Sequence, residues 1–231
     1  MSKRDVGVVI VAGGSGSRVG GKELKQLRWI AGKPMLLHSL QTFMARPDVV
    51  SVVCVLPPAY AGDPPPWIFQ CDVDRLMLSV GGKTRQQSAS NGLDDLPDEA
   101  DIVLIHDAAR PGVTDAMIGR VIKAVRHDGA ATAALPVSDT IKSVDGAGRI
   151  TGTVDRSRLW RAQTPQGFRR EIIVRAHREA GGSLDATDDA GLCERLGIPV
   201  TVVHGDERAM KVTEEGDFVR AEALLAVPHA S

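Results

Sequence analysis

The sequence has few aromatic residues and almost no net charge, and each shortage argues against a class of function. Aromatic residues make up 3% of the 231 positions, too few for the stacking platforms that bind single-stranded nucleic acids. The formal net charge is −1, so no overall field attracts the chain to nucleic acid or to an anionic membrane. We therefore expect neither of these partners.

Cysteines and long apolar runs are scarce as well. Cys54, Cys71 and Cys193 are widely spaced and form no Cys-x-x-Cys pair, which argues against a disulfide framework or a structural zinc site. The first residues lead directly into an apolar run of strand length, and no run reaches the length of a membrane span or a signal peptide. We expect a cytoplasmic protein.

A glycine-rich loop near the N-terminus is the most informative feature that the sequence does contain. The β-branched run 8–11 predicts a buried strand, and the cations Arg18, Lys22 and Lys25 follow it closely. Glycines between them let the backbone turn tightly and offer bare N–H groups, which suit a phosphate chain. The loop predicts a nucleoside triphosphate site, with a ligand-free turn as the alternative. Its residues are Ala12, Gly13, Gly14, Ser15 and Gly16.

Two familiar phosphate-binding motifs do not account for this loop. The glycine and lysine spacing of 16–22 matches a Walker A loop, but Glu23 stands where that motif needs a hydroxyl for Mg²⁺. The segment 14–19 begins like a dinucleotide fingerprint, but Val19 replaces its last glycine.

Apolar runs of strand length alternate with segments of helical spacing along most of the chain. Expected strands cover 6–11, 49–56, 75–80, 102–105, 130–137 and 199–203; expected helices cover 34–44, 84–93, 115–126, 169–180, 188–196 and 214–226. Thr84, Thr114 and Thr213 are the expected helix N-caps. The alternation predicts an α/β fold, a Rossmann-like, mostly parallel twisted sheet with helices on both faces, in one domain over 1–231. The proline-rich segment 57–66 is expected to be irregular.

The alternation stops at residues 138–158, where apolar residues are thinly spread around the turn 145–148. This segment predicts a protruding β-hairpin with too little apolar surface for a core element. Because a lone hairpin is marginal in water, we expect the arm to clasp a second copy of the chain and form a homodimer. Packing on its own domain is the alternative.

Polar residues at the ends of the expected strands are the candidates for chemistry, since ligands of open parallel sheets bind there. Arg85 and Ser88 follow the glycines at 81–82, and Asp107 follows the strand at 102–105. Asp107 suits Mg²⁺ bound to a triphosphate; the alternative is a loop carboxylate paired with Arg110. His38 and His106 are interpreted as structural.

No serine or cysteine is framed by a base. The sequence therefore indicates a reaction whose substrate supplies the nucleophile, such as phosphoryl-type transfer. In such a reaction the protein positions the reactants and neutralises charge.

A series of motifs in fixed order gives the chain a family likeness. Together they resemble 2-C-methyl-D-erythritol 4-phosphate cytidylyltransferase of the non-mevalonate isoprenoid pathway, and the likeness covers nearly the whole chain. The motifs are Ala-Gly-Gly-Ser-Gly-Ser-Arg at 12–18, Lys-Gln at 25–26, Gly-Lys-Pro-Met at 32–35, His-Asp-Ala-Ala-Arg-Pro at 106–111, Asp-Thr at 139–140, Thr-Val-Asp-Arg at 153–156, Gln-Thr-Pro-Gln-Gly-Phe at 163–168, Thr-Asp-Asp at 187–189 and Lys-Val-Thr at 211–213.

The resemblance implies that methylerythritol phosphate attacks the α-phosphorus of CTP, with Mg²⁺, and that pyrophosphate leaves. It implies that Arg18 and Lys25 stabilise charge on the α-phosphate, and that Arg156 and Lys211 position the attacking phosphate. Asp107 would hold Mg²⁺. With the strand-end candidates, the predicted CTP-binding set is Ala12, Gly13, Gly14, Ser15, Gly16, Gly82, Arg85 and Ser88, and the predicted substrate-binding set is Asp107, Arg110, Thr140, Arg156, Thr187 and Lys211.

The family is dimeric with interlocking arms. The resemblance therefore implies that Thr140 and Arg156, which lie on the arm segment, act on the neighbouring copy's site.

Several positions depart from the family pattern, and none removes a proposed catalytic cation. Leu24 stands where proline is usual, Lys83 where an acidic residue is common, and Arg208-Ala209 where Glu-Asn is frequent. The first change predicts a less rigid loop, and the last puts any further metal or ribose contact near Asp206 in doubt.

Three other interpretations stay open at this point. The first is a cytidylyltransferase for ribitol phosphate or another polyol phosphate. The second alanine of His-Asp-Ala-Ala-Arg favours the methylerythritol phosphate enzyme over it. The second is a nucleotide-binding regulator without turnover, which has no need of Arg18, Lys25 and Lys211 together. The third is a fragment fused to a cyclase, for which a chain ending at Ser231 leaves little room. The preferred hypothesis requires Lys25 and Lys211 to meet near one phosphorus atom.

Overall fold

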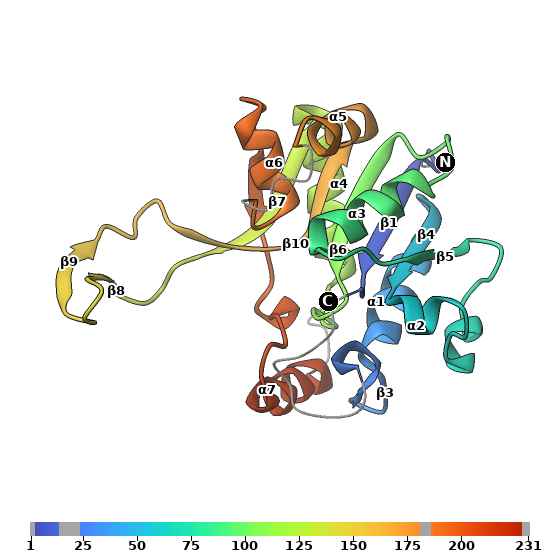
Figure 1. The fold of residues 1–231 in the computed structure, drawn as a ribbon, viewed down its shortest axis with the longest axis horizontal. Coiled ribbons are helices and arrows are strands. Elements are labelled where there is room, and N and C mark those ends of the chain that lie inside the picture. Colours follow the sequence, from blue (N-terminus) through green and yellow to red (C-terminus); the bar gives the residue numbers. More distant parts are fainter. Residues whose placement is uncertain (1–2, 14–23, 181–185, 228–231) are drawn as a thin grey trace.

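A seven-stranded sheet with the strand order β11-β7-β10-β6-β1-β4-β5 forms the centre of the structure (Figure 1). The structure is a computed structural model that describes residues 3–13, 24–180 and 186–227. The strands of this sheet are β1 (Val6–Val11), β4 (Val49–Leu56), β5 (Leu76–Val80), β6 (Ile102–Asp107), β7 (Ala130–Pro136), β10 (Trp160–Arg169) and β11 (Thr201–His204).

Most of the sheet is parallel, which confirms the expected fold class. β1 pairs in parallel with β4 and β6, β4 with β5, and β7 with β11. Only β10 among these seven strands runs against its neighbours, β6 and β7. β10 was not predicted from the sequence, because Pro165 and Gly167 are residues that central strands disfavour. The register of β10 with β7 shifts between Ala162 and Gln166, around Pro165.

Helices cover both faces of the sheet, as predicted. Val8 and Ile10 of β1 belong to one apolar core with residues of α1 (Met35–Met44) and α4 (Asp115–Asp128). Val9 points to the opposite face, because side chains alternate along a strand. It packs in a second core with residues of α3 (Arg85–Asp94), α5 (Arg170–Ala180) and α6 (Asp189–Arg195). The expected strands and helices agree with the observed ones to within two residues at each end.

The last helix, α7 (Glu215–Ala226), packs beside the sheet on a small core of its own. This core includes Ile30 of β2 (Trp29–Ile30), Met35 after β3 (Lys33–Pro34), and Val212. The helix begins one residue later than expected, since Glu214 rather than Thr213 is the N-cap. Thr213 instead donates through its hydroxyl to the Asp217 carboxylate, 2.7 Å away. Short 3-10 helices occupy Lys25–Leu27 and Glu207–Ala209.

The helical caps at Thr84 and Thr114 are confirmed. Their hydroxyl oxygens accept from the backbone N–H groups of Gln87 and Met117 at 3.0 and 3.3 Å. The proline-rich segment was predicted incorrectly. It contains the one-turn helix α2 (Pro58–Ala61) and leads into a 3-10 helix at Pro66–Gln70, because proline suits the first position of a helix.

The predicted hairpin arm is present and projects from the body of the molecule (Figure 1). Its strands are β8 (Ile141–Val144) and β9 (Ile150–Val154), and the Asp145 side chain accepts two backbone N–H bonds in the turn. The arm has no buried residue between 138 and 158, so within one copy of the chain it adds nothing to the core. In the described ranges, no helix is long and apolar enough to cross a membrane.

Candidate active site

The predicted site residues meet where parallel strands end. Asp107 is the last residue of β6 and lies opposite Val11, the last residue of β1. The N–H of Ala12 continues the ladder by donating to Val55 of β4 at 2.9 Å, and Gly81 donates to Leu56 at 2.7 Å. The strands therefore deliver their following loops to one edge of the sheet, as expected for an open parallel sheet.

Two glycines let the loops after β1 and β5 approach each other closely. A Cβ atom on Gly13 would lie 2.9 Å from Ser88 Oγ and 3.3 Å from Gly81 Cα, and one on Gly81 would lie 3.1 Å from Gly13 Cα. Ser88 holds the second loop, because its hydroxyl oxygen accepts from the N–H of Gly82 at 3.0 Å and donates to Thr84 at 2.9 Å. The two backbones therefore pack directly against each other at this edge, which side chains at Gly13 and Gly81 would prevent. Four predicted phosphate-loop residues, Gly14, Ser15, Gly16 and Arg18, lie outside the described residues.

Asp107 lies between two cations from distant parts of the sequence. Its Oδ1 is 2.9 Å from Arg85 Nε, and its Oδ2 is 2.8 Å from Lys211 Nζ. Burial alone would raise the pKa of Asp107, but the positive charges of Arg85 and Lys211 outweigh it and hold that pKa well below its usual value. Asp107 is therefore an anion at every ordinary pH.

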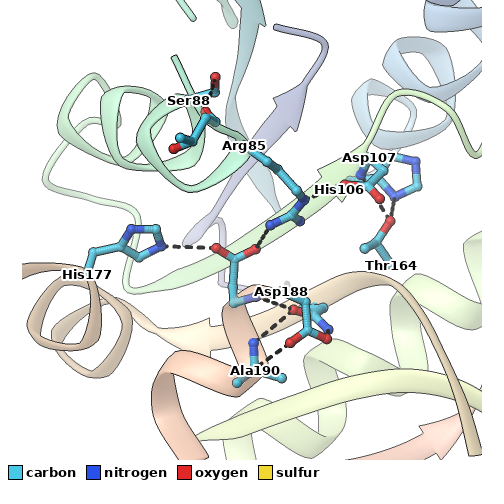
Figure 2. A network of polar contacts seen from close by, with 12 residues as sticks. Arg85, Ser88, His106, Asp107, Thr164, His177, Asp188 and Ala190 are labelled. Carbon is cyan, nitrogen blue, oxygen red and sulfur yellow. Dashed lines mark hydrogen bonds and ion pairs between the residues drawn. The ribbon is translucent and has the colours of Figure 1, made fainter. Parts of the chain in front are cut away.

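Arg85 continues the contacts to α6 and α5, which pack on the same face of the sheet as α3 (Figure 2). Its Nη1 lies 2.7 Å from Asp189 Oδ2, and Asp189 Oδ1 lies 3.0 Å from Nε2 of His177. Burial would lower the pKa of Arg85, but Asp189 and Asp107 together raise it. Arg85 was predicted to bind CTP, and it lies between two carboxylates.

Arg110 fixes the loop that follows Asp107. Its guanidinium donates to the carbonyl oxygens of Ala209 and Ala162 at 2.8 and 3.2 Å. These bonds join the loop to β10 and to the segment before Lys211. The alternative in which Asp107 pairs with Arg110 is not the arrangement found, since the Asp107 oxygens contact Arg85 and Lys211.

A cavity of about 160 Å³ opens on this cluster. Arg85, Arg110 and Lys211 bring three positive charges to its lining, against the negative charges of Asp107 and Asp188. Five of the predicted site residues line it, namely Arg85, Asp107, Arg110, Thr187 and Lys211; the remaining lining residues are Ala162, Gln163, Thr164, Gln166 and Asp188.

Lys25 approaches the same region from the start of the chain. Its Nζ donates to the carbonyl oxygen of Val212 at 2.7 Å, and Val212 follows Lys211 directly. Lys25 and Lys211 therefore do not lie on opposite sides of the molecule, which is the arrangement that would have ruled out the hypothesis.

The arm carries two further predicted residues, Thr140 and Arg156. Both are exposed, and Arg156 donates to the Ser138 carbonyl within the arm. Thr140 directly precedes β8, and Arg156 follows β9 by two residues; this hairpin projects from the body of the molecule (Figure 1).

Sequence reasoning missed the role of Gln166 and His177. Gln166 is fully buried; its Oε1 accepts from the N–H groups of Asp189 and Ala190, both at 3.0 Å, and its Nε2 donates to Asp188 at 2.7 Å. It thereby fixes the start of α6 and places Asp189. A polar run of Gln-Thr-Pro-Gln inside an otherwise apolar sheet was the available signal, because buried polar groups need partners.

A divalent cation at this edge would have Asp107 as its carboxylate ligand. Across the described ranges, no three acidic, histidine or cysteine side chains cluster as a metal group. Each Asp107 oxygen already has one cationic partner, and a carboxylate oxygen has two lone pairs, so one accepting position is left on each. Because Mg²⁺ keeps most of its waters and takes few protein ligands, the residues fit an ion held mainly by triphosphate oxygens.

His106 is structural, as interpreted from the sequence. The Thr164 hydroxyl oxygen accepts from the N–H of Asp107 at 3.0 Å, so its own proton is directed to His106 Nδ1 at 3.1 Å. Nε2 then carries the ring proton and donates to the Arg110 carbonyl oxygen at 3.2 Å. Burial lowers the pKa of His106 to about 4, and the neutral ring ties both ends of the loop 107–110 together.

We expect His106 to make the folded chain less stable as the pH is lowered through a defined window. Its pKa is lower in the folded chain, about 4, than the ordinary value of 6.5, so between these pH values the unfolded chain binds more protons. The free energy of unfolding therefore falls as pH falls from about 6.5 to 4, by at most ~1.4 kcal/mol per pH unit. Urea unfolding at pH 7, 6 and 5 measures this slope.

The control for this prediction is His106→Gln, which keeps an N–H donor but does not titrate. Its slope should be shallower than that of the unsubstituted chain, whatever its stability at pH 7. His38, whose pKa burial also lowers, contributes equally to both proteins. Equal slopes would contradict the assignment.

Known proteins resemble this chain over nearly its whole length. A family model described as IspD, 2-C-methyl-D-erythritol 4-phosphate cytidylyltransferase, matches residues 6–227. The chain is 41% identical over 227 residues to the 2-C-methyl-D-erythritol 4-phosphate cytidylyltransferase of Syntrophus aciditrophicus, covering 96% of this chain and 97% of that protein. The crystal structure of the enzyme of that name from Thermus thermophilus is similar with a TM-score of 0.79 and 35% identity, over 96% of this chain and 100% of that one.

Some relatives are longer than this chain. The chain is 40% identical over 219 residues to the bifunctional enzyme IspD/IspF of Desulfotalea psychrophila, covering 94% of this chain and 56% of that protein. It therefore spans little more than half the length of the bifunctional relatives that it matches. The match to the family model over nearly the whole sequence confirms the resemblance inferred from the motifs, and the chain belongs to the 2-C-methyl-D-erythritol 4-phosphate cytidylyltransferase family, IspD.

Proposed function

We propose that this chain transfers the cytidylyl group of CTP to 2-C-methyl-D-erythritol 4-phosphate. A phosphate oxygen of the sugar phosphate attacks the α-phosphorus of CTP, and the bond from that phosphorus to the bridging oxygen of the β-phosphate breaks. The products are 4-diphosphocytidyl-2-C-methyl-D-erythritol and pyrophosphate, which leaves with the bonding electron pair.

The three free thiols, Cys54, Cys71 and Cys193, suit a protein of the reducing cytoplasm.

The observation that carries this proposal is the convergence of two lysines. Lys25 Nζ lies 2.7 Å from the carbonyl oxygen of Val212, and the adjacent Lys211 lies 2.8 Å from Asp107 at the end of β6. In-line transfer at phosphorus requires positive charge near both the attacking and the leaving oxygens. The two lysines are candidates for these two positions.

The predicted catalytic cations, Asp107 and part of the predicted CTP-binding set have roles in this reaction. Lys25, with Arg18, would stabilise charge that builds on the α-phosphate, while Lys211 and Arg156 would position the attacking phosphate. The backbones of Gly13 and Gly82, with Ser88, would hold the cytidine. Asp107 would hold Mg²⁺, which when bound neutralises triphosphate charge and orients the phosphate oxygens.

We further propose that the chain acts as a homodimer through its arm. The arm exposes apolar side chains, with Val144 58% and Ile150 66% exposed. A hairpin without a buried face is marginal on its own, and a second copy would cover it. Thr140 and Arg156 would then complete the neighbouring copy's site.

The substrate assignment is tested by pyrophosphate release with purified protein, Mg²⁺ and matched pairs of substrates. We expect turnover with CTP and methylerythritol phosphate, because the chain has the residues of this family. ATP, GTP and UTP should give little product in place of CTP. Preference for ribitol 5-phosphate would instead make it the related polyol phosphate enzyme, and CTP binding without turnover would make it a regulator.

Lys25→Ala should reduce kcat far more than CTP affinity. A cation that meets its full charge only in the transition state contributes to turnover rather than to binding, so kcat should fall by ~10²–10³-fold. Single-turnover kinetics and calorimetric titration with CTP separate the two quantities. Lys123→Ala, on the exposed face of α4, is the matched control and should change neither kcat nor CTP affinity. Equal losses in kcat and CTP affinity for Lys25→Ala would indicate a purely binding role.

Subunits carrying Lys25→Ala and Arg156→Ala should complement each other. In a mixed dimer, one site combines both substitutions, and the other receives an intact Lys25 from its own body and an intact Arg156 from the partner's arm. Co-expression with two different tags isolates the mixed dimer, which should show about half the activity of the unsubstituted dimer. If the arm serves its own body, mixing will restore nothing above the parent variants.

A further inference from the structure

We infer that Asp189, oriented by His177, is a positioning residue that holds Arg85 against Asp107 and so leaves Lys211 as the cation for the attacking phosphate. The inference deepens the proposed function and rests on it for the identity of that phosphate. It assigns Arg85 a different role from the CTP contact expected from the sequence.

The contacts of the two cations on Asp107 differ in kind. Arg85 is held at two atoms, with Nε 2.9 Å from Asp107 and Nη1 2.7 Å from Asp189. Because a guanidinium is a rigid planar fork, two carboxylates on adjacent edges fix its orientation. Lys211 ends in a rotatable ammonium with three donors; it contacts the Asp107 carboxylate at one atom, and its side chain is 42% exposed. Lys211 is therefore the cation that can turn towards a ligand.

Asp189 is itself fixed from two sides (Figure 2). Its side chain is 1% exposed, and its Oδ1 accepts a hydrogen bond from Nε2 of His177 at 3.0 Å. Burial would raise the pKa of Asp189, but Arg85 and His177 outweigh it and lower that pKa. The carboxylate therefore accepts only, and His177 Nε2 must carry a proton. The backbone N–H of Asp189 donates to Gln166, so neither end of the residue can shift alone.

We call the contact of Arg85 with both Asp107 and Asp189 the clamp. It matters because of the balance of charges around the cavity. Arg85, Arg110 and Lys211 supply three positive charges, and Asp107, Asp188 and Asp189 supply three negative ones, so one cation must be released from a carboxylate to hold a phosphate. When Lys211 turns to that phosphate, Arg85 still neutralises the buried Asp107. Without Asp189 as its second anchor, Arg85 would itself be drawn to the phosphate, and the buried carboxylate of Asp107 would lose its fixed partner, which is costly.

The kinetic test uses Asp189→Asn, Arg85→Gln and the double variant. Each single variant should lower kcat/KM for the sugar phosphate by about 10- to 100-fold, the scale of one charged hydrogen bond, with CTP affinity changed by less than ~3-fold. Because Asp189 acts through Arg85, the double variant should be no worse than Arg85→Gln. Multiplying effects would overturn the inference, and so would a large loss of CTP affinity in Arg85→Gln.

The matched control is another buried carboxylate paired with an arginine. Asp5, at the opposite end of β1, is 2% exposed, and its oxygens lie 2.7 and 3.0 Å from the Arg126 guanidinium. Asp5→Asn should lower the melting temperature and leave the kinetic constants unchanged. If it reproduces the kinetic defect of Asp189→Asn, the effect is one of general stability and the inference fails.

Two further measurements keep the inference testable if Asp189→Asn does not fold or if the proposed reaction is wrong. His177→Gln keeps an N–H donor and should retain kcat/KM, whereas His177→Leu should lower it as Asp189→Asn does; equal values for the two would overturn the inference.

The second measurement needs no substrate. The Arg85 Nε–H signal in an arginine-labelled NMR spectrum is identified by its loss in Arg85→Gln. It should be protected from exchange in the unsubstituted chain and exposed in His177→Leu. An unchanged signal would overturn the clamp, whereas a clamp without any turnover of CTP by the unsubstituted chain would refute only the proposed function.

Discussion

A buried carboxylate at the end of a parallel strand is the constraint on which the rest of the site depends. Asp107 is 7% exposed, and a charge at such a position is tolerated only if opposite charges and hydrogen bonds compensate it. The compensating groups are Arg85 from α3 and Lys211 from the segment before α7. Because these residues are far apart in the sequence, neutralising Asp107 forces distant elements to meet at one edge of the sheet.

The antiparallel strand β10 supplies the polar contacts that hold those elements in place. Thr164 binds the N–H of Asp107, and Gln166 binds the start of α6. Gln163 both donates to and accepts from the backbone of Asp206, shortly before Lys211, at 2.9 and 3.1 Å. Three separate segments of the site therefore depend on one strand. This explains why a stretch with proline and glycine occupies the middle of the sheet: its polar side chains place loops, while Phe168 packs in the core.

Sequence reasoning reached the fold through local signals and the site only in part. The apolar run of β1, the caps at Thr84 and Thr114, and the position of Asp107 follow from residues close in sequence. Family motifs extended this to Lys25 and Lys211. The strand β10 was not predicted, because it is stabilised by its neighbours β6 and β7 and not by an apolar pattern of its own.

The contacts of Arg85 could not be predicted from neighbouring residues in the sequence either. Arg85 and Asp189 are 104 positions apart, and no periodicity relates them. Such a pair can be found only once the sheet order is known, or from the observation that a Thr-Asp-Asp segment provides both an N-cap, Asp188, and a second carboxylate that the helix does not need.

The arm connects assembly with catalysis if the proposed roles of Thr140 and Arg156 hold. The described body gathers the cations Arg85, Arg110 and Lys211 around one cavity, but two of these are committed, Arg85 to carboxylates and Arg110 to backbone carbonyls. A doubly charged phosphate needs more positive charge than Lys211 alone provides. A second copy would supply it through Arg156, so the same apolar surface that makes the arm unstable alone would bring the missing charge into the site.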